Sequence, residues 1–453
     1  MIELVYALSL VLIFTGFGRF IQERLYPTSD QLGDILYSFG FGTGTVIIIM
    51  YVFGWIGLFR QLPILVLLAS MAVFAGMRLP WLFTAMKTLK LPTGNRLILT
   101  IIGIFLFVNL IGALSPVTDS DGLGYHLAFP KVYLEHGGFV YHPMISSTWP
   151  LSIEMIFGVA LAIGDDVLAK LMHFFFGVFT ALATFYLAKR FTDEKTAFLA
   201  SAFFYTIPLV AIESGICYND LGIAFFFMLG FTAWLDWYKH KTLSSFYCAS
   251  VFLGLAASVK WNGPLIVVII TGISLWKMIK DKSPDLITHL LIFVLISASF
   301  SGMWYAKNAF FNGNPFGPFA ECIFDGVNWA PQNTDAYRAS VESMDRSPLH
   351  FITAPFKLFL SPGQYGEITF LGPLLLMLIP IGLFHKEKKG LTPLLVFCGI
   401  FYVVWFLSSQ QSRLLLPILP LLCVFAAWSF SGIETKSIFA IIVICMLLNL
   451  VFP

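Results

Sequence analysis

The stretch TDSDGLGYH, residues 118–126, places two aspartates two positions apart and follows them with a tyrosine and a histidine. The aspartates are Asp119 and Asp121, and the aromatic residues are Tyr125 and His126. A carboxylate can take a proton from an acceptor hydroxyl, and paired carboxylates can also hold Mg²⁺ or Mn²⁺ with a pyrophosphate. The i, i+2 spacing alone is a weak motif, so both kinds of chemistry stay open.

Further polar side chains stand where membrane helices are expected to end. Ionisable residues at such depth are costly, so each is a functional candidate. Cations there could bind a phosphate and stabilise the charge on a leaving group. The candidates for substrate binding are Tyr125, His126, Lys131, His142, Glu213, Asp220, Lys260, Asn262, Asn308, Asn314 and Arg413. Simpler roles also stand: an N-cap for Asp220, snorkelling for Lys260, a turn at Asn314 and an interfacial anchor for Arg413.

The composition is that of an integral membrane protein. Hydrophobic residues make up 58% and charged residues 11% of the chain, whereas globular proteins carry about a quarter charged residues. The six cysteines show no CxxC or metal spacing, which indicates isolated small hydrophobic side chains. No Walker loop, Rossmann fingerprint, HExxH or GxSxG motif occurs, so soluble nucleotide chemistry has no support.

About 20 apolar residues cross a bilayer, and about 17 can suffice. We therefore predict an all-α polytopic membrane protein with about 14 transmembrane helices and surface helices on its outer face. The N-terminal run, which follows an acidic residue, is expected to be a first span and not a signal peptide. The expected spans are 3–19, 36–58, 62–79, 97–115, 167–188, 197–212, 221–238, 244–259, 264–279, 286–305, 368–384, 392–408, 414–431 and 437–452.

The basic residues predict which loops face the cytoplasm. Lysine and arginine concentrate in the loops 80–96, 189–195, 239–241, 277–282 and 386–389. If the short apolar piece 149–164 crossed the membrane, the later basic loops would lie outside, so we expect it to lie along the outer surface or to re-enter. A second piece, 351–360, is also expected to be interfacial. The aspartate stretch and the other candidates then share the outer face, in loops 116–166 and 306–367.

In order and spacing, these blocks resemble the GT-C superfamily of membrane glycosyltransferases, which includes the protein O-mannosyltransferases and the lipid A aminoarabinose transferase. Residues 121–125, DGLGY, are similar to the D-E-x-x-Y motif of the first outer loop, and TWPL at 148–151 stands where a K-P-P-L-like run is expected. The other blocks are IGDDVLAKLMHFFFGVFTALATFYLAKRF, IPLVAIESGICYNDLGIAFFF, GLAASVKWNG, WYAKNAFFNGNPFGPF and SRLLLPILP. The resemblance covers roughly residues 97–430.

The resemblance implies roles for these residues. Asp121 would be the catalytic base with Asp119 beside it, the two roles being exchangeable. Lys260 and Arg413 would bind the donor phosphate, and Asp220 and Glu213 would line the acceptor or sugar site.

The sequence departs from the family pattern at two places. Gly122 removes the second acid of the D-E pair, unless Asp119 supplies it from the other side. The lysine of the second pattern is also missing, so His142, Lys131 or Lys260 would have to replace it.

The resemblance further implies a catalytic core at 97–430, preceded by N-terminal transmembrane helices at 1–96 and followed by a last one at 431–453. The enzyme would move a sugar from a polyprenyl phosphate to a glycan, lipid or protein acceptor on the non-cytoplasmic side. It would need no cofactor, with Mg or Mn as an option at Asp119 and Asp121, and no nucleic acid. We expect a bacterial inner membrane with a periplasmic active site.

Two other functions stay open. An O-antigen-type polymerase or ligase would use paired arginines in a long outer loop, and Arg338 and Arg346 lie in the loop 306–350. A secondary transporter would use Asp220, Glu213 and Lys260 for ion coupling, but transporters tend to show internal repeats and charges at the membrane midplane. Neither feature is evident in the sequence.

Overall fold

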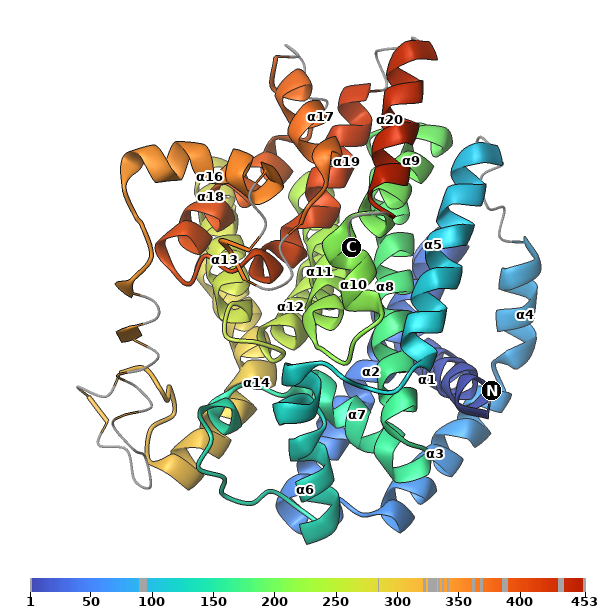
Figure 1. The fold of residues 1–453 in the computed structure, drawn as a ribbon. Coiled ribbons are helices and arrows are strands. Elements are labelled where there is room, and N and C mark those ends of the chain that lie inside the picture. The colour runs from blue at the N-terminus through green and yellow to red at the C-terminus, as the bar shows by residue number, and fades with distance from the viewer. Residues whose placement is uncertain are drawn as a thin grey trace. The chain divides into compact units, whose positions relative to one another are not determined.

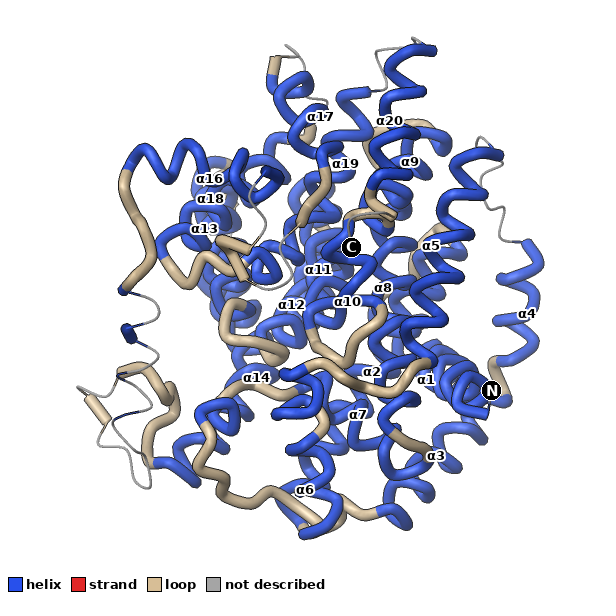
Figure 2. Tube along the Cα trace, viewed as in Figure 1, coloured by secondary structure: helices blue, strands red, loops and turns tan. Residues whose placement is uncertain are grey.

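The computed structural model describes residues 2–88, 96–283, 285–320, 323–324, 332, 335, 338–339, 342–360, 363–366, 370–384, 390–430 and 436–450. The predicted inner-face loop 386–389, residues 89–95 of the loop 80–96 with Lys90, and Cys322 lie outside these residues. The described residues form helices joined by turns and loops, and their sole strand-like pairing is an isolated bridge between Gly363 and Gly366 (Figures 1 and 2).

The chain divides into two compact units, each built from separate segments. The first unit comprises residues 1–89, 114–173 and 217–343, and the second comprises 90–113, 174–216 and 344–453. This division is one of compactness, and the expected core at 97–430 with its flanking helices stays a prediction.

The first unit holds most of the candidate residues. Its helices are α1 (Ile2–Leu25), α2 (Gln31–Ile56), α3 (Gln61–Gly76), α4 (Leu79–Thr88), η1 (Gly122–His126), α6 (Ala128–His136), η2 (Ile145–Thr148), α7 (Ser152–Ile163), the start of α8 (Asp166–Ala188), α11 (Asp220–His240), α12 (Leu243–Ala257), α13 (Gly263–Lys280) and α14 (Leu286–Asn312). Glycines let α1 and α2 approach closely: a Cβ on Gly42 would lie 1.9 Å from the Phe14 carbonyl oxygen.

The second unit contains most of α5 (Arg96–Leu114), the rest of α8, and the C-terminal helices. These are α9 (Glu194–Tyr205), α10 (Pro208–Ser214), α16 (Pro348–Leu360), α17 (Pro373–Leu383), α18 (Thr392–Leu407), η3 (Ser412–Ile418), α19 (Leu419–Phe430) and α20 (Lys436–Leu448). Its core forms where α19 packs on α9 and α17.

Every predicted span overlaps a helix, which confirms the all-α membrane fold. Among the described residues, 8 helices are long and apolar enough to cross a membrane, or up to 10 if the bent pairs α3 with α4 and α9 with α10 each count as one span. Helices α12, α17, α18 and α20 are shorter, so the predicted number of 14 is not confirmed.

Helix α7 covers the piece that the sequence places along the outer surface or in a re-entrant loop. Its 12 residues span about 18 Å at 1.5 Å per residue, too short for a bilayer core of about 30 Å. All side chains from Ser152 to Ala160 are buried, against α2, α3 and α6 among others. The helix is therefore part of the interior of the first unit and does not lie exposed.

Candidate active site

The two aspartates lie at a π-helical turn, a local irregularity that often marks functional sites. The Leu127 N–H donates to the Gly122 carbonyl at 2.9 Å, five residues back, which widens the turn. The Asp119 carboxylate accepts the Gly122 N–H at 2.7 Å and so fixes the start of the turn. Both Asp119 and Asp121 stay partly exposed, so either carboxylate can meet a substrate.

Glycine at position 122 is explained by the Asp119 carboxylate. A Cβ on Gly122 would lie 2.0 Å from Asp119 Oδ1, closer than any real contact. The carboxylate of Asp119 thus fills the space where a side chain at 122 would begin. That Asp119 takes the place of the acid missing from position 122 stays a prediction.

Aromatic rings line the inner side of this turn. The Tyr125 ring lies 4.0 Å from the His126 ring between centroids, and the Tyr218 ring lies 5.2 Å from His126. The Tyr125 hydroxyl lies 3.4 Å from Asp121 Oδ2, within reach of a hydrogen bond. Tyr125 and His126 are buried, so they support the turn from within.

Glu154 of α7 is buried behind this turn. It has no exposed surface, and its Oε1 lies 2.5 Å from His126 Nδ1 and accepts the Asn219 amide at 2.9 Å. Burial raises the pKa of the Glu154 carboxyl from 4.5 to about 8, because the charged form loses its hydration. The Glu154 and His126 side chains form a buried acid–base pair at the end of the turn that follows the aspartates.

A second buried pair stands next to the first. Lys260 Nζ donates to both carboxylate oxygens of Asp220, at 2.8 and 2.7 Å. Asp220 opens α11, yet its carboxylate binds the ammonium group and makes no described cap bond. The expected N-cap and snorkelling roles therefore do not describe this pair, and a phosphate would have to share Lys260 with Asp220.

Helix α8 adds two groups to the surroundings of the turn. The Lys170 ammonium donates to Ser115 Oγ at 3.2 Å and to the Pro116 carbonyl at 3.3 Å, and its charge acts on Asp119. His173 Nε2 accepts the Leu221 N–H at 3.2 Å at the start of α11. Lys170 thus holds the segment that leads into the aspartates and supplies a positive charge near it.

Two amide candidates hold backbone in place. Asn308 donates to the Thr148 carbonyl at 2.5 Å, and the neighbouring Lys307 donates to the Ser147 carbonyl at 2.8 Å. Asn314 bonds within its own loop, donating to the Phe319 carbonyl and accepting the Phe316 N–H. The end of α14 therefore holds the backbone of the 145–149 segment through hydrogen bonds. The family pattern places a lysine in this segment.

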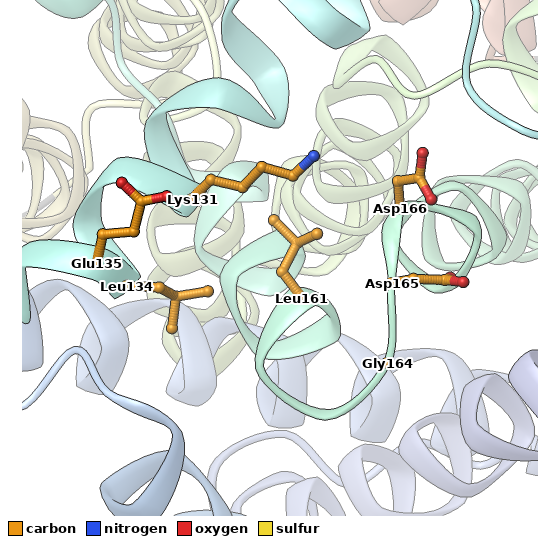
Figure 3. A pocket seen from close by; sticks show the side chains of 7 residues that line it. All are labelled: Lys131, Leu134, Glu135, Leu161, Gly164, Asp165 and Asp166. Atoms are coloured by element: carbon orange, nitrogen blue, oxygen red, sulfur yellow. The ribbon is translucent and has the colours of Figure 1, made fainter.

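Lys131 lies in a pocket of about 430 Å³ beside the turn. Figure 3 shows it extending from α6 toward the side on which Asp165 and Asp166 lie, while Glu135 stays on the α6 side. Leu134, Leu161 and Gly164 complete the lining. The three carboxylates of the lining would repel a phosphate. The pocket therefore suits a neutral, hydroxyl-rich group better than it suits the donor phosphate.

The remaining candidates are placed as follows. His142 is half-buried, its Nδ1 accepts the Met144 N–H at 3.3 Å, and it belongs to the loop before η2. Asn262 precedes α13 and is half-buried. Glu213 is buried in α10, and Arg413 of η3 donates to Gln411 Oε1 at 3.2 Å; both belong to the second unit.

Glu154, Asn219 and Lys170 are not among the residues predicted from the sequence. Glu154 is the one charged residue of the piece 149–164 and Lys170 falls inside an expected span, so each was open to the rule that flags charges in apolar runs. Their partners could not be read from the sequence. Within the described residues, no three His, Cys, Asp or Glu side chains are placed to hold a metal ion. The use of a divalent ion stays a prediction.

Comparison with known proteins supports the resemblance. Residues 151–312 match the profile of the dolichyl-phosphate-mannose-protein mannosyltransferase family. This match begins at α7 and includes Glu154, Asn219, Asp220 and Lys260, but it covers less than half of the chain. A search of the curated proteins found no match.

Solved structures share the fold. ArnT from Cupriavidus metallidurans bound to undecaprenyl phosphate matches with a TM-score of 0.52 and 13% identity, over 76% of this chain and 61% of ArnT. Its apo form matches with a TM-score of 0.50, also at 13% identity and over the same shares. The oligosaccharyltransferase AglB from Archaeoglobus fulgidus, in complex with an inhibitory peptide and a dolichol phosphate, gives 0.48 at 13% identity, over 76% and 51%. The chain has the GT-C type of fold and spans about three-fifths of the length of ArnT.

Proposed function

We propose that the chain is a GT-C glycosyltransferase that moves a sugar from a polyprenyl-phosphate donor to an acceptor hydroxyl on the non-cytoplasmic side. The observation that carries the proposal is the π turn, where two partly exposed aspartates precede His126 of one buried acid–base pair and a second buried pair, Asp220–Lys260, lies next to the first. Three of the four residues in those pairs lie in the segment that matches the mannosyltransferase profile. ArnT, which shares the fold, was crystallised with undecaprenyl phosphate, which supports a lipid-phosphate donor here.

In the proposed reaction Asp121 takes the proton from the acceptor hydroxyl as its oxygen attacks the anomeric carbon. The bond between that carbon and the phosphate oxygen breaks, and polyprenyl phosphate leaves with the bonding electrons. Lys260 is the proposed cation for the phosphate, which it would reach while still bound to Asp220. The Asp119 carboxylate, fixed on the Gly122 N–H, orients the turn and keeps a negative charge beside Asp121.

The pocket around Lys131 is the proposed place for the acceptor. It combines carboxylate and ammonium groups, which bind sugar or peptide hydroxyls, with two leucines. The positive charge of Lys170 interacts with Asp119 in the turn and with Asp166 in the pocket lining, so it couples the pocket to the turn electrostatically. The identity of the sugar and of the acceptor is left to experiment.

The structure adds little support to the other two hypotheses, a polymerase or ligase and a secondary transporter. Arg346, one of the paired arginines of the polymerase hypothesis, is hydrogen-bonded to the Leu407 and Ser408 carbonyls, 3.3 Å away in each case, and so holds backbone. The charges of the transporter hypothesis include Asp220 and Lys260, which are bonded to each other.

The test uses purified protein in nanodiscs and a panel of polyprenyl-phosphate sugars that includes the mannosyl lipid. Release of free polyprenyl phosphate is followed for the wild type, Asp121→Asn and Asp119→Asn, each with and without EDTA. We expect release by the wild type and a loss of about 10²–10⁴-fold in Asp121→Asn, the usual share of a general base. Loss of wild-type release with EDTA would make the aspartates a metal site. A wild type that neither releases nor binds any lipid donor would refute the proposal.

A further inference from the structure

Glu154 joins two parts of the candidate site that the sequence presents separately. Its Oε1 contacts His126 Nδ1 and also accepts the Asn219 amide, which in turn donates to the Val259 carbonyl at 3.3 Å. One carboxyl oxygen therefore ties the aspartate turn to the start of α11 and to the end of α12. His126 lies 28 residues and Asn219 lies 65 residues from Glu154 in the chain.

Each of these ties ends at a residue proposed for the reaction. On one side the His126 ring contacts the tilted ring of Tyr125, whose hydroxyl faces Asp121. On the other side Asn219 immediately precedes Asp220, and Val259 immediately precedes Lys260. A single buried side chain thus connects the segment of the proposed base with the segments of the proposed phosphate ligand.

The buried pair is stable in one protonation state. A proton shared between Glu154 Oε1 and His126 Nδ1 leaves the pair neutral overall, whichever atom holds it. Loss of that proton would leave a net negative charge with no exposed surface, which is costly. Glu154 Oε2 has no hydrogen-bond partner in the structure, so nothing described compensates a second charge there. The titratable groups that face Glu154 are His126, Tyr133, Cys217, Asp220 and Lys260.

We propose that Glu154 is a positioning residue, which holds Asp121 and the Asp220–Lys260 pair in their reactive arrangement only while its pair with His126 is neutral. This inference rests on the proposed function. It makes sugar transfer sensitive to the protonation of a group that touches no substrate. Burial raises the pKa of Glu154 to about 8, so the arrangement is intact at neutral pH and is lost in alkaline solution.

The substitution Glu154→Gln tests this directly. Glutamine has nearly the same shape as protonated glutamate, and its side-chain oxygen in the place of Oε1 can accept both the Asn219 amide and the N–H of a neutral His126 protonated on Nδ1. We expect Glu154→Gln to transfer sugar at neutral pH, and Glu154→Leu, which can bond neither partner, to be slow. Above about pH 8 the wild type should lose roughly tenfold in kcat/KM per pH unit, and Glu154→Gln should stay level. Glu194→Gln, on an exposed glutamate at the start of α9, is the matched control and should keep the alkaline loss.

A second readout needs no activity. The folded carboxyl keeps its proton up to about pH 8, whereas the unfolded one loses it near 4.5, so the folded state binds more protons between these values. The free energy of unfolding should therefore fall as pH rises through this window and then level off. Glu154→Gln should lack that contribution, and Glu194→Gln should retain it.

The outcomes separate the two proposals. An active wild type whose alkaline loss persists in Glu154→Gln overturns the role of Glu154 and leaves the proposed function standing. Absence of transfer by the wild type at every pH overturns the proposed function, and the unfolding measurement still decides whether Glu154 holds a proton. An unchanged pH dependence of unfolding in Glu154→Gln would contradict the inference by itself.

Discussion

Two of the polar clusters described in the first unit invite comparison, and only one of the two has the features of an active site. The arginine cluster consists of Arg19, Glu23, Asp34 and Arg78, from α1, α2 and the junction of α3 with α4. The aspartate corner consists of Asp119, Asp121, His126, Glu154, Asn219, Asp220 and Lys260. Both would be flagged as costly charges in an apolar chain.

The arginine cluster matches each negative charge with a positive one. Arg19 Nη1 lies 2.8 Å from Asp34 Oδ2, and Arg78 pairs with Glu23. Gln22 donates to Asp34 at 2.7 Å, and the Arg19 guanidinium lies 4.3 Å from the centre of the Trp81 ring. Such a cluster ties the ends of helices together and leaves no carboxylate without a cation.

The aspartate corner distributes its bonds differently. Its buried members pair with each other, while Asp119 and Asp121 remain partly exposed above them. Among the described residues the Glu154 Oε2 and Asn219 Oδ1 atoms have no hydrogen-bond partner, and neither has Arg78 Nε in the arginine cluster. The lesson is that neither a charge nor an unpaired polar atom identifies a site. What differs is that each carboxylate of the arginine cluster is paired with a guanidinium, whereas in the corner the buried groups pair with each other and two aspartates remain partly exposed.

The largest expected effect on stability is in the corner. Lys260→Ala would leave the Asp220 carboxylate buried without its ammonium partner, which costs about 3–5 kcal/mol in free energy of unfolding. Unfolding in mixed micelles would measure it. The double variant Lys260→Met with Asp220→Leu should regain most of that stability, but it should not transfer sugar. A double variant that transferred sugar normally would show the pair to be structural, like the arginine cluster.

Gly122→Ala comes next and acts on geometry alone. The added Cβ would displace the Asp119 carboxylate and distort the turn that presents Asp121. A shift of about 1 Å in a reacting group can cost about 10²-fold in rate, so kcat for sugar transfer should fall by roughly that factor. Gly124→Ala, where nothing lies within 4 Å of the new Cβ, is the control and should stay close to the wild type. Equal rates in both variants would show that Asp119 does not set the geometry.

Arg19→Ala should affect stability without affecting chemistry. It removes a charged donor from Asp34, at a cost of about 1–3 kcal/mol in free energy of unfolding. The rate of transfer per folded molecule should not change. A loss of rate in folded Arg19→Ala would erase the distinction between the two clusters.

The smallest expected effect is at the pocket. Lys131→Ala should raise KM for the acceptor a few-fold and leave donor binding unchanged, since the surrounding carboxylates disfavour a phosphate there. Steady-state kinetics with the acceptor varied, together with equilibrium binding of polyprenyl phosphate, would measure both. Weaker lipid binding in this variant would return Lys131 to the role of a phosphate ligand.

The sequence predicts the helices well and the pairings poorly. Apolar runs are local signals, so the helices could be predicted from them, while the outer position of the aspartate stretch stays a prediction from the basic loops. The partners of Glu154 and of Lys260 could not, because His126 lies 28 residues from Glu154 and Asp220 lies 40 residues from Lys260. Glu154 itself was not predicted, because only the length of the piece 149–164 and its effect on the topology of the later loops enter the prediction of its membrane position. For Asn308 and Asn314 substrate binding stays a prediction, and the hydrogen bonds described for them hold backbone, which the sequence could not show.

The central claim is that the exposed carboxylate of the corner performs chemistry and the carboxylate of the arginine cluster does not. The most direct measurement compares Asp121→Asn with Asp34→Asn, in nanodiscs, for release of polyprenyl phosphate per folded molecule. We predict that Asp121→Asn unfolds like the wild type but is about 10²–10⁴-fold slower, and that Asp34→Asn is less stable but transfers at the wild-type rate. Transfer by Asp121→Asn at the rate of Asp34→Asn would contradict the account.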